Sequence, residues 1–284
     1  VCGRPDENLL KSSPRLKHLI IPWAGIPPST AKLLASYRNI SVHNIHHNAV
    51  SAAELAISLT LAAARQIVPS DRQLRSGDWS WRSRQDSSVL IYGSRILILG
   101  YGSIGRRIGC IFKSMGASVS GIRRNITGTH RTGGVALYPP DALHEVLGVT
   151  DILILCLPLT KETESIIGAE ELGLLLNRSI VVNIGRGRLI DEKALYEHLR
   201  NGSIGSAGID VWYSYPSSDA DGAVTHPSRF AFGELDNVVM TPHLGGAYGS
   251  DKTEKLRMEH LASSINSAAS GKDIPCRIDL ELGY

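Results

Sequence analysis

The sequence predicts an α/β fold in which a doubly wound parallel sheet is inserted into a smaller lobe. Between residues 94 and 183, apolar runs of strand length alternate with segments of helical pattern, as in a sheet whose strands are joined by crossover helices. The glycine motif GYGSIG stands at 100–105, between the first apolar run and the first helix of this series. The two ends of the chain lack the alternation, and 284 residues suffice for two domains.

The strands of the predicted sheet read as continuous apolar runs, because helices cover both faces of a parallel sheet. Such runs predict strands over 95–100, 117–122, 151–158, 178–185, 206–212 and 237–243. Helices are predicted over 103–115, 140–148 and 191–202, the last with a glycine stop at Gly202. Residues 214–229 are predicted to form an irregular loop.

The two ends of the chain are predicted to form one smaller lobe. Strands are expected over 16–21 and 40–45, with helices over 29–36 and 252–270. The segment 51–67 is apolar on almost all sides, so we expect a helix that is buried or packed against a partner chain. The smaller lobe is predicted to comprise 1–84 and 250–284, and the dinucleotide-binding domain 85–249.

Composition narrows the class of function. The chain is 43% hydrophobic and 20% charged, with a net charge of +3. This charge suits small anionic ligands and is far from the basic stripe of a nucleic-acid binder. The apolar stretches are too short to span a bilayer, so we expect no membrane partner.

The cysteines predict a reducing, cytoplasmic location. They are scattered and lack a CxxC pair, so reduced thiols are expected, with Cys110 and Cys156 buried in apolar runs. No metal site is predicted, because His43, His46 and His47 have no neighbouring pattern of cysteines or acids to complete one.

The glycine motif predicts a site for a dinucleotide. Gly100 permits a tight turn, Gly102 lets the backbone approach a pyrophosphate, and Gly105 lets helix and strand pack closely. The amide groups at the start of the following helix can then bind the phosphates.

Two arginines follow the second predicted strand, about twenty residues after the glycine motif. An acid at this position binds the free ribose hydroxyl of NAD, whereas a guanidinium binds a phosphate. Arg123 and Arg124 therefore predict NADP (NADPH) in preference to NAD. The alternative is that both are merely solvated charges at a strand end.

Three later motifs end strands of the same sheet: NIGRG (183–187), GIDVW (208–212) and TPHLGG (241–246). Their side chains are expected at the carboxyl edge, where open α/β sheets bind ligands. With the glycine motif and LPLTKET (157–163), and in this order, they make the chain resemble the D-isomer-specific 2-hydroxyacid dehydrogenases, among them glyoxylate and hydroxypyruvate reductases. The resemblance implies a Rossmann domain, a flavodoxin-like substrate lobe and a homodimer joined through the helix at 51–67.

The resemblance also implies the roles of the site residues. Arg186 holds the substrate carboxylate, and His243 is the general acid and base at the carbonyl oxygen. Asp210 orients the nicotinamide carboxamide. The implied cofactor-binding residues are Gly100, Tyr101, Gly102, Ser103, Ile104, Gly105, Arg123, Arg124, Leu157, Pro158, Thr163, Ile184, Gly185, Asp210, Gly245 and Gly246. The implied substrate-binding residues are Ala24, Gly25, Ile26 and Asn48.

Each of these residues also has a structural explanation. Arg186 could pair with Asp191 or Glu192 at a helix start. His243 could satisfy backbone groups at a turn, and Asp210 could cap a loop.

The sequence departs from the family at Tyr215, where most members carry a glutamate that raises the pKa of the histidine. Tyrosine brings no charge near neutral pH, so His243 is expected to titrate lower than in its relatives unless Asp219, Asp221 or Glu234 reaches it. Tyr215 is counted with the catalytic residues. The lobe also starts later than in relatives, so we expect either that the sequence is a fragment or that the lobe is trimmed at its N-terminus.

The predicted activity is hydride transfer between NADP(H) and a small 2-oxo or 2-hydroxy acid of the glyoxylate or hydroxypyruvate class. Two alternatives stay open. One is a non-catalytic dinucleotide sensor on the same fold, and the other is a dehydrogenase of another small anion such as formate or phosphite.

Overall fold

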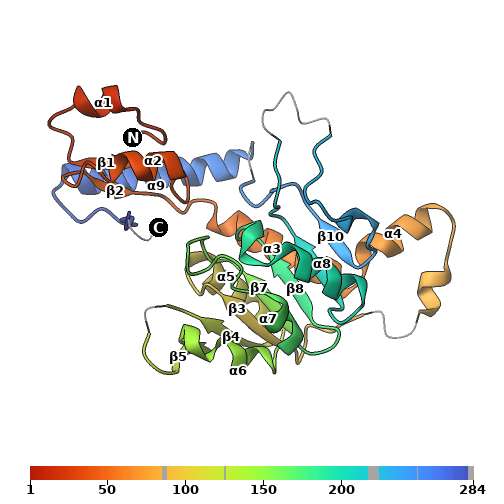
Figure 1. The fold of residues 1–284 in the computed structure, drawn as a ribbon. Helices are drawn as coiled ribbons and strands as arrows, with labels where there is room; N and C mark the ends of the chain where they lie inside the picture. The colour runs from red at the N-terminus through yellow and green to blue at the C-terminus, as the bar shows by residue number, and fades with distance from the viewer. Residues whose placement is uncertain (85–87, 125, 217–223, 248, 281–284) are drawn as a thin grey trace. The chain divides into compact units, whose positions relative to one another are not determined.

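The computed structural model describes residues 1–84, 88–124, 126–216, 224–247 and 249–280. The chain forms two compact units (Figure 1), one of Val1–Ser51 with Gly246–Tyr284 and one of Ala52–Gly245. The insertion of one domain into the other agrees with the sequence prediction. The boundaries at 84 and 249 were wrong: residues 52–84 belong to the larger unit, because the helix that starts them packs into its core.

The larger unit is built on one sheet with eight strands among the described residues. Their order is β10-β9-β8-β7-β3-β4-β6-β5, parallel throughout except that β5 runs antiparallel to β6. The bounds are β3 (Arg95–Leu99), β4 (Ser118–Ile122), β5 (His130–Thr132), β6 (Val135–Tyr138), β7 (Ile152–Leu155), β8 (Ile180–Asn183), β9 (Ser206–Ile209) and β10 (Val238–Met240). This order is that of a doubly wound Rossmann sheet, with its switch point between β3 and β7.

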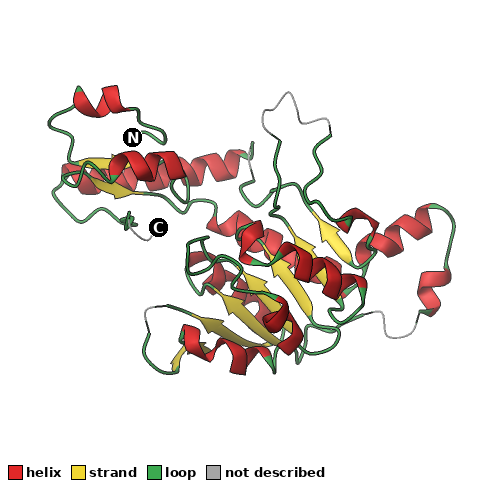
Figure 2. Ribbon diagram, in the orientation of Figure 1, coloured by secondary structure: helices red, strands yellow, loops and turns green. Residues whose placement is uncertain are grey.

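Helices cover both faces of this sheet (Figure 2). They are α3 (Ala49–Ala64), α5 (Ser103–Ser114), α6 (Leu143–Leu147), α7 (Ala169–Leu174) and α8 (Glu192–Arg200). A further helix, α4 (Ile67–Arg75), follows α3 and leaves Ile67 and Leu74 exposed. Side chains alternate between the faces along each strand. Accordingly, Ile96 and Ile98 of β3 lie in one core cluster with residues of α3 and α5, while Leu97 and Leu99 lie in another with residues of α6, α7 and α8.

The helix predicted over 51–67 ends earlier and is followed by a second helix. Gln66 adopts a left-handed conformation (φ 52°), and the axis bends by 63° from α3 to α4. In the described residues no single helix is long and apolar enough to cross a membrane. Among these residues, only the bent pair of α3 and α4, taken together, has the length and apolar composition of a membrane span. The buried side chains of α3, among them Ala52, Ala56 and Leu59, lie in a core cluster of the larger unit, as the burial alternative predicted.

One further prediction was wrong. Cys110 was expected to be buried but is exposed, because α5 is amphipathic and buries Ile108, Gly109 and Phe112 instead.

The smaller unit has a two-stranded parallel sheet of β1 (His18–Ile20) and β2 (Ser41–His43). Its helices are α1 (Glu7–Lys11), α2 (Pro28–Leu34) and α9 (Asp251–Ala269). The core joins Leu19 of β1, Val42 of β2 and Leu34 of α2 with Ile278, whose amide donates to the Val42 carbonyl. The C-terminal segment thus completes the core of this unit. That the lobe is a trimmed flavodoxin-like domain stays a prediction.

Candidate functional site

The switch point of the sheet brings two predicted motifs together. Gly100 follows β3, and Leu157 follows the neighbouring strand β7. The Cys156 amide donates to the Leu99 carbonyl at 2.9 Å. A Cβ on Gly100 would lie 2.9 Å from the Leu157 amide nitrogen. The glycine turn and the LPLTKET loop are therefore in contact at the carboxyl edge, where Rossmann sheets bind dinucleotides.

The three glycines of the motif have three different surroundings. Gly100 has φ +96°, a conformation that favours glycine. A Cβ on Gly105 would lie 2.4 Å from the Gly100 carbonyl oxygen, so α5 packs against the turn only because that side chain is absent. A Cβ on Gly102 would meet nothing within 4 Å. The open face at Gly102 is where a pyrophosphate would approach, above the start of α5, so the residues present fit a dinucleotide.

Contacts with Tyr101 and Cys156 also fix the glycine turn. Tyr101 is buried, and its ring occupies the space that Gly109 and Gly121 leave free: a Cβ there would lie 2.9 Å and 2.7 Å from its atoms. The Cys156 thiol donates to the Gly100 carbonyl at 3.1 Å, and burial raises the pKa of this thiol to about 12. The thiol therefore stays a protonated donor that fixes the turn. Tyr101 packs within the fold rather than facing a ligand.

The different surroundings of Gly102 and Gly105 give a prediction. Gly102→Ala is expected to leave the melting temperature unchanged but to weaken NADPH binding about tenfold, because the methyl group enters the space open to the pyrophosphate. Gly105→Ala, the matched variant, is expected to cost about 1–3 kcal/mol of stability through overpacking. Thermal unfolding and a fluorescence titration with NADPH measure both. Equal losses of stability in the two variants would contradict the assignment.

Arg123 and Arg124 stand directly after β4, beside the glycine turn. Both are exposed, and the amides of Gly100 and Tyr101 donate to the carbonyl of Ile122, the residue before Arg123. Hydrogen bonding from Thr160 lowers the pKa of Glu162, and the charge of Arg124 contributes to the same shift. The charge of Arg124 therefore acts on the LPLTKET loop, which is in contact with the glycine turn. Asn125, the next residue, lies outside the described residues.

The LPLTKET loop folds on itself. Thr163 Oγ1 donates to the Pro158 carbonyl at 2.7 Å and accepts from the Thr160 amide at 2.7 Å. The hydroxyl predicted to bind the cofactor therefore shapes the loop that follows β7. Leu157 and Pro158 stand where this loop leaves the sheet.

Arg186 follows β8 and is fixed at its backbone by Asn183. The Asn183 side chain donates to the Arg186 carbonyl at 2.9 Å and accepts from the Gly185 amide at 3.1 Å. The guanidinium is exposed, and its Nη1 donates to the Gly185 carbonyl at 2.6 Å. The fully buried amide of Asn183 was not predicted as a site residue; its signal is a polar residue at the end of an otherwise apolar strand.

The two acids considered as structural partners of Arg186 are engaged elsewhere. Asp191 caps α8 by accepting from the Ala194 amide at 2.8 Å. Glu192 pairs with Arg229 at 2.8 Å. These contacts remove the simplest structural explanation for Arg186.

Asp210 holds the turn that carries His243. The carboxylate, almost completely buried, accepts from Thr241 Oγ1 and the Leu244 amide at 2.7 Å each and from the Gly245 amide at 3.0 Å. The loop-capping alternative therefore describes what Asp210 does in the structure, and its contact with a nicotinamide stays a prediction. His243 itself has φ +59°, and the Asp210 bonds on either side of it hold this left-handed conformation.

His243, Tyr215 and Arg186 form one group at the carboxyl edge. The rings of Tyr215 and His243 lie 5.6 Å apart, centroid to centroid, and are tilted by 54°. The Tyr215 hydroxyl accepts from the Trp212 amide at 3.0 Å. The aromatic ring, and not the hydroxyl, therefore faces the histidine.

The surroundings lower the pKa of His243. Burial is the main cause, the Asp210 carboxylate partly opposes it, and the Arg186 charge adds to the lowering. A lowered pKa of His243 is the direction expected where the uncharged Tyr215 replaces a glutamate. Of the three acids suggested as substitutes, Asp219 and Asp221 lie outside the described residues, and Glu234 is exposed in a short 3-10 helix. Asp210 is the acid whose charge acts on His243 here.

The predicted substrate-binding residues belong to the smaller unit. Ala24, Gly25 and Ile26 lie in the turn between β1 and α2, where Gly25 has φ +80°. The Trp23 ring lies where a Cβ on Gly3 would stand, 1.8 Å from that position. The turn is therefore braced by the start of the chain. Asn48 stands directly before α3.

Comparison with known proteins agrees with this geometry. Residues 57–245 match the family model described as "D-isomer specific 2-hydroxyacid dehydrogenase, NAD binding domain". A glyoxylate reductase of Pyrococcus furiosus is 34% identical over 285 aligned positions, which cover 98% of this chain and 80% of the relative. A glycerate dehydrogenase of Methylorubrum extorquens is 30% identical, over 93% of this chain and 80% of its own.

Solved structures show the same fold. A D-isomer specific 2-hydroxyacid dehydrogenase from Xanthobacter autotrophicus, in complex with NADPH and MES, has a TM-score of 0.78 and 25% identity, covering 99% of this chain and 83% of its own. A D-lactate dehydrogenase with NAD⁺ from Lactobacillus jensenii has a TM-score of 0.75 and 25% identity, covering 96% and 82%. The chain therefore belongs to the D-isomer specific 2-hydroxyacid dehydrogenase family, and it is an NAD(P)-dependent oxidoreductase acting on CH–OH donors.

Proposed function

We propose that the protein is an NADPH-dependent reductase of small 2-oxo acids, of the glyoxylate or hydroxypyruvate class. The observation that carries the coenzyme preference is the pair Arg123–Arg124, which directly follows Ile122, the residue whose carbonyl accepts from the amides of Gly100 and Tyr101. The relatives named glyoxylate reductase support the substrate class.

The proposed roles follow from the group at the carboxyl edge. A bound nicotinamide coenzyme would supply hydride. Arg186 binds the substrate carboxylate, because its planar fork donates to both oxygens. His243 gives a proton to the carbonyl oxygen in reduction and takes it back in oxidation. Asp210 keeps the His243 turn in place for both steps.

The test of the proposed function is NADPH oxidation with glyoxylate and with hydroxypyruvate, measured against NADH under the same conditions. A protein that binds NADPH but oxidises it with neither acid would contradict the substrate class. Formate and phosphite, assayed with NADP⁺ in the oxidative direction, test the alternative anions.

The coenzyme preference gives a further prediction. The double variant Arg123→Gln/Arg124→Gln is expected to raise the dissociation constant of NADPH about 10- to 100-fold, because hydrogen bonds to a charged group contribute about 1.5–3 kcal/mol. Binding of NADH is expected to change little. The control is Arg65→Gln, an exposed arginine next to the end of α3. An equal loss of affinity for NADPH and NADH would show that the arginines do not bind the extra phosphate of NADPH.

Tyr215 gives the pH prediction. Reduction needs protonated His243, so its rate falls as the pH rises through the pKa of this imidazole, which the site holds below its ordinary value. Tyr215→Glu places a carboxylate beside the ring and is expected to raise that pKa, which moves the falling limb of the pH–rate profile upward. Tyr215→Phe keeps the ring contact and is expected to leave the limb in place. Identical profiles for the two variants would contradict the contact seen in the structure.

We also propose a cytoplasmic homodimer. The second helix of the bent pair and the 3-10 turn after it leave large apolar side chains exposed, at Ile67, Leu74 and Trp79. Ala24, Gly25, Ile26 and Asn48 are proposed to bind the substrate. Size-exclusion chromatography with light scattering measures the oligomeric state.

A further inference from the structure

The smaller unit contains a hollow of about 500 Å³ at the end of its sheet where β1 and β2 begin. Four segments that are separate in the sequence line it: the turn after α1, the start of β1, the turn before β2, and the C-terminal segment. The lining residues are Pro14, Arg15, Leu16, Lys17, His18, Arg38, Asn39, Ser41 and Arg277. They include none of the residues predicted to bind coenzyme or substrate.

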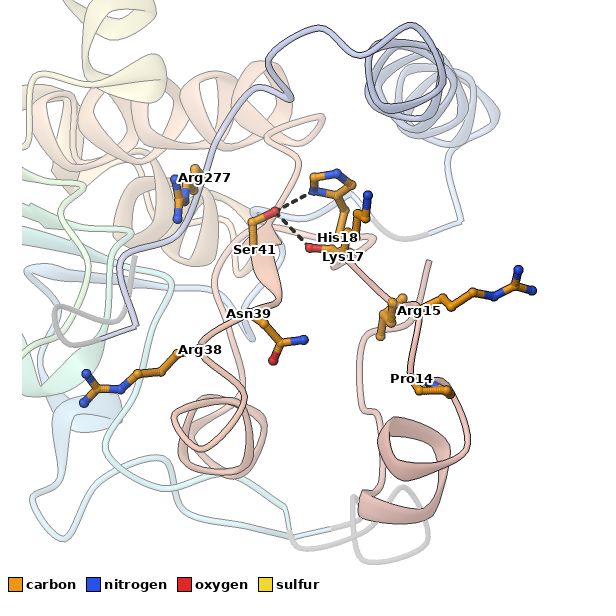
Figure 3. A pocket seen from close by; sticks show the side chains of 9 residues that line it. Pro14, Arg15, Lys17, His18, Arg38, Asn39, Ser41 and Arg277 are labelled. Atoms are coloured by element: carbon orange, nitrogen blue, oxygen red, sulfur yellow. Dashed lines mark hydrogen bonds between the residues drawn. The ribbon is translucent and has the colours of Figure 1, made fainter.

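The charged residues that line the hollow are all basic, and we call it the basic hollow. Four of the nine lining residues are arginine or lysine, a fifth is histidine, and none is acidic. Figure 3 shows His18 and Ser41 side by side, with Arg38 and Arg277 on one flank and Arg15 on the other. The cationic groups thus stand around the hollow instead of converging on one point, which suits an anion that carries more than one charged group.

The backbone holds the positions of these side chains. The Ser41 amide donates to the Lys17 carbonyl at 2.9 Å, which joins the starts of the two strands. Arg277 faces His43 across an isolated antiparallel bridge. Its neighbour Ile278 is buried in the core of the unit. The basic residues are therefore placed by core elements and not by a free terminus.

A chain of hydrogen bonds joins the rings of His43 and His18 through Ser41. The Pro275 carbonyl can only accept, so His43 Nδ1, 3.1 Å away, donates to it. Burial lowers the pKa of His43, and the charges of His18 and Arg277 lower it further, so the ring is neutral and its Nε2 accepts from Ser41 Oγ at 2.9 Å. Ser41 Oγ then accepts from His18 Nδ1 at 2.7 Å (Figure 3). The chain thereby orients both rings beside Ser41.

We propose that the basic hollow is a second anion site of the protein, one that takes a small polyanion of the pyrophosphate or bisphosphate class.

The binding test uses pyrophosphate and the NADPH-saturated protein, so that the coenzyme fills the phosphate-binding turn of the other unit. Isothermal titration is expected to show one pyrophosphate per chain. Lys17→Gln/Arg277→Gln is expected to weaken this binding about tenfold, while Lys272→Gln, an exposed lysine outside the hollow, leaves it unchanged. Unchanged NADPH affinity in all three proteins shows that they are folded.

Two results would overturn the site: no pyrophosphate binding to the NADPH-saturated protein, or equal binding by the double variant and the wild type. The Gly102→Ala protein, whose methyl group enters the space proposed for the coenzyme pyrophosphate, gives the same measurement without relying on NADPH. There, retained pyrophosphate binding supports the hollow, and loss of binding places the anion at the coenzyme site instead.

Discussion

Replacing His243 with asparagine is expected to lower kcat for 2-oxo acid reduction about 10²- to 10⁴-fold, the range that a positioned general acid contributes. Asparagine suits this position because it tolerates the left-handed conformation that His243 adopts at φ +59°. The Asp210 bonds to Thr241, Leu244 and Gly245 use backbone and a hydroxyl, so they remain in the variant. The turn should keep its shape while losing its proton donor.

The measurement is steady-state reduction of glyoxylate with NADPH, together with NADPH binding by fluorescence. Binding of the coenzyme is expected to change little. The pH dependence supplies a second readout: the falling limb attributed to His243 should disappear in the variant. A variant that keeps the wild-type limb would show that another group donates the proton.

Much of the sheet could be predicted from the sequence because its strands are buried on both faces. The buried runs 96–99 and 152–155, both ILIL, have no polar residue to suggest an alternative. The strands β5 and β6 were not predicted; β5 is exposed at the sheet edge and has a polar sequence. The first helix ends at Gln66 in a left-handed conformation, and the nearest signal in the sequence is Pro69, in the first turn of α4.

The candidate site was predicted as a set of strand ends, and the structure brings those ends together. Parallel strands place their carboxyl termini at one edge, so order along the chain suffices to gather Gly100, Leu157, Arg186 and Asp210. The internal contacts of the site could not be predicted. Asp210 binds backbone amides more than thirty residues away, and no side-chain pattern marks such partners.

The side chain of Arg186 is expected to matter most for the substrate carboxylate. Arg186→Gln should lower kcat/KM for glyoxylate about 10²- to 10³-fold, similar to the loss of one preorganised donor to a developing oxyanion. Asn183 holds the backbone at this residue through the Arg186 carbonyl and the Gly185 amide, so the substitution should not move the turn. NADPH binding is expected to be retained.

The matched control is Arg188→Gln, which removes an exposed guanidinium two residues further on that contacts Glu164. Arg188→Gln should change kcat/KM for glyoxylate little. Its loss of stability should also be small, because exposed ion pairs contribute about 0–1 kcal/mol. An aldehyde without a carboxylate provides the decisive comparison: both arginine variants should reduce it at the wild-type rate. If Arg186→Gln is as slow with the aldehyde as with glyoxylate, the guanidinium acts on the carbonyl or the coenzyme, and the carboxylate must be held by other groups.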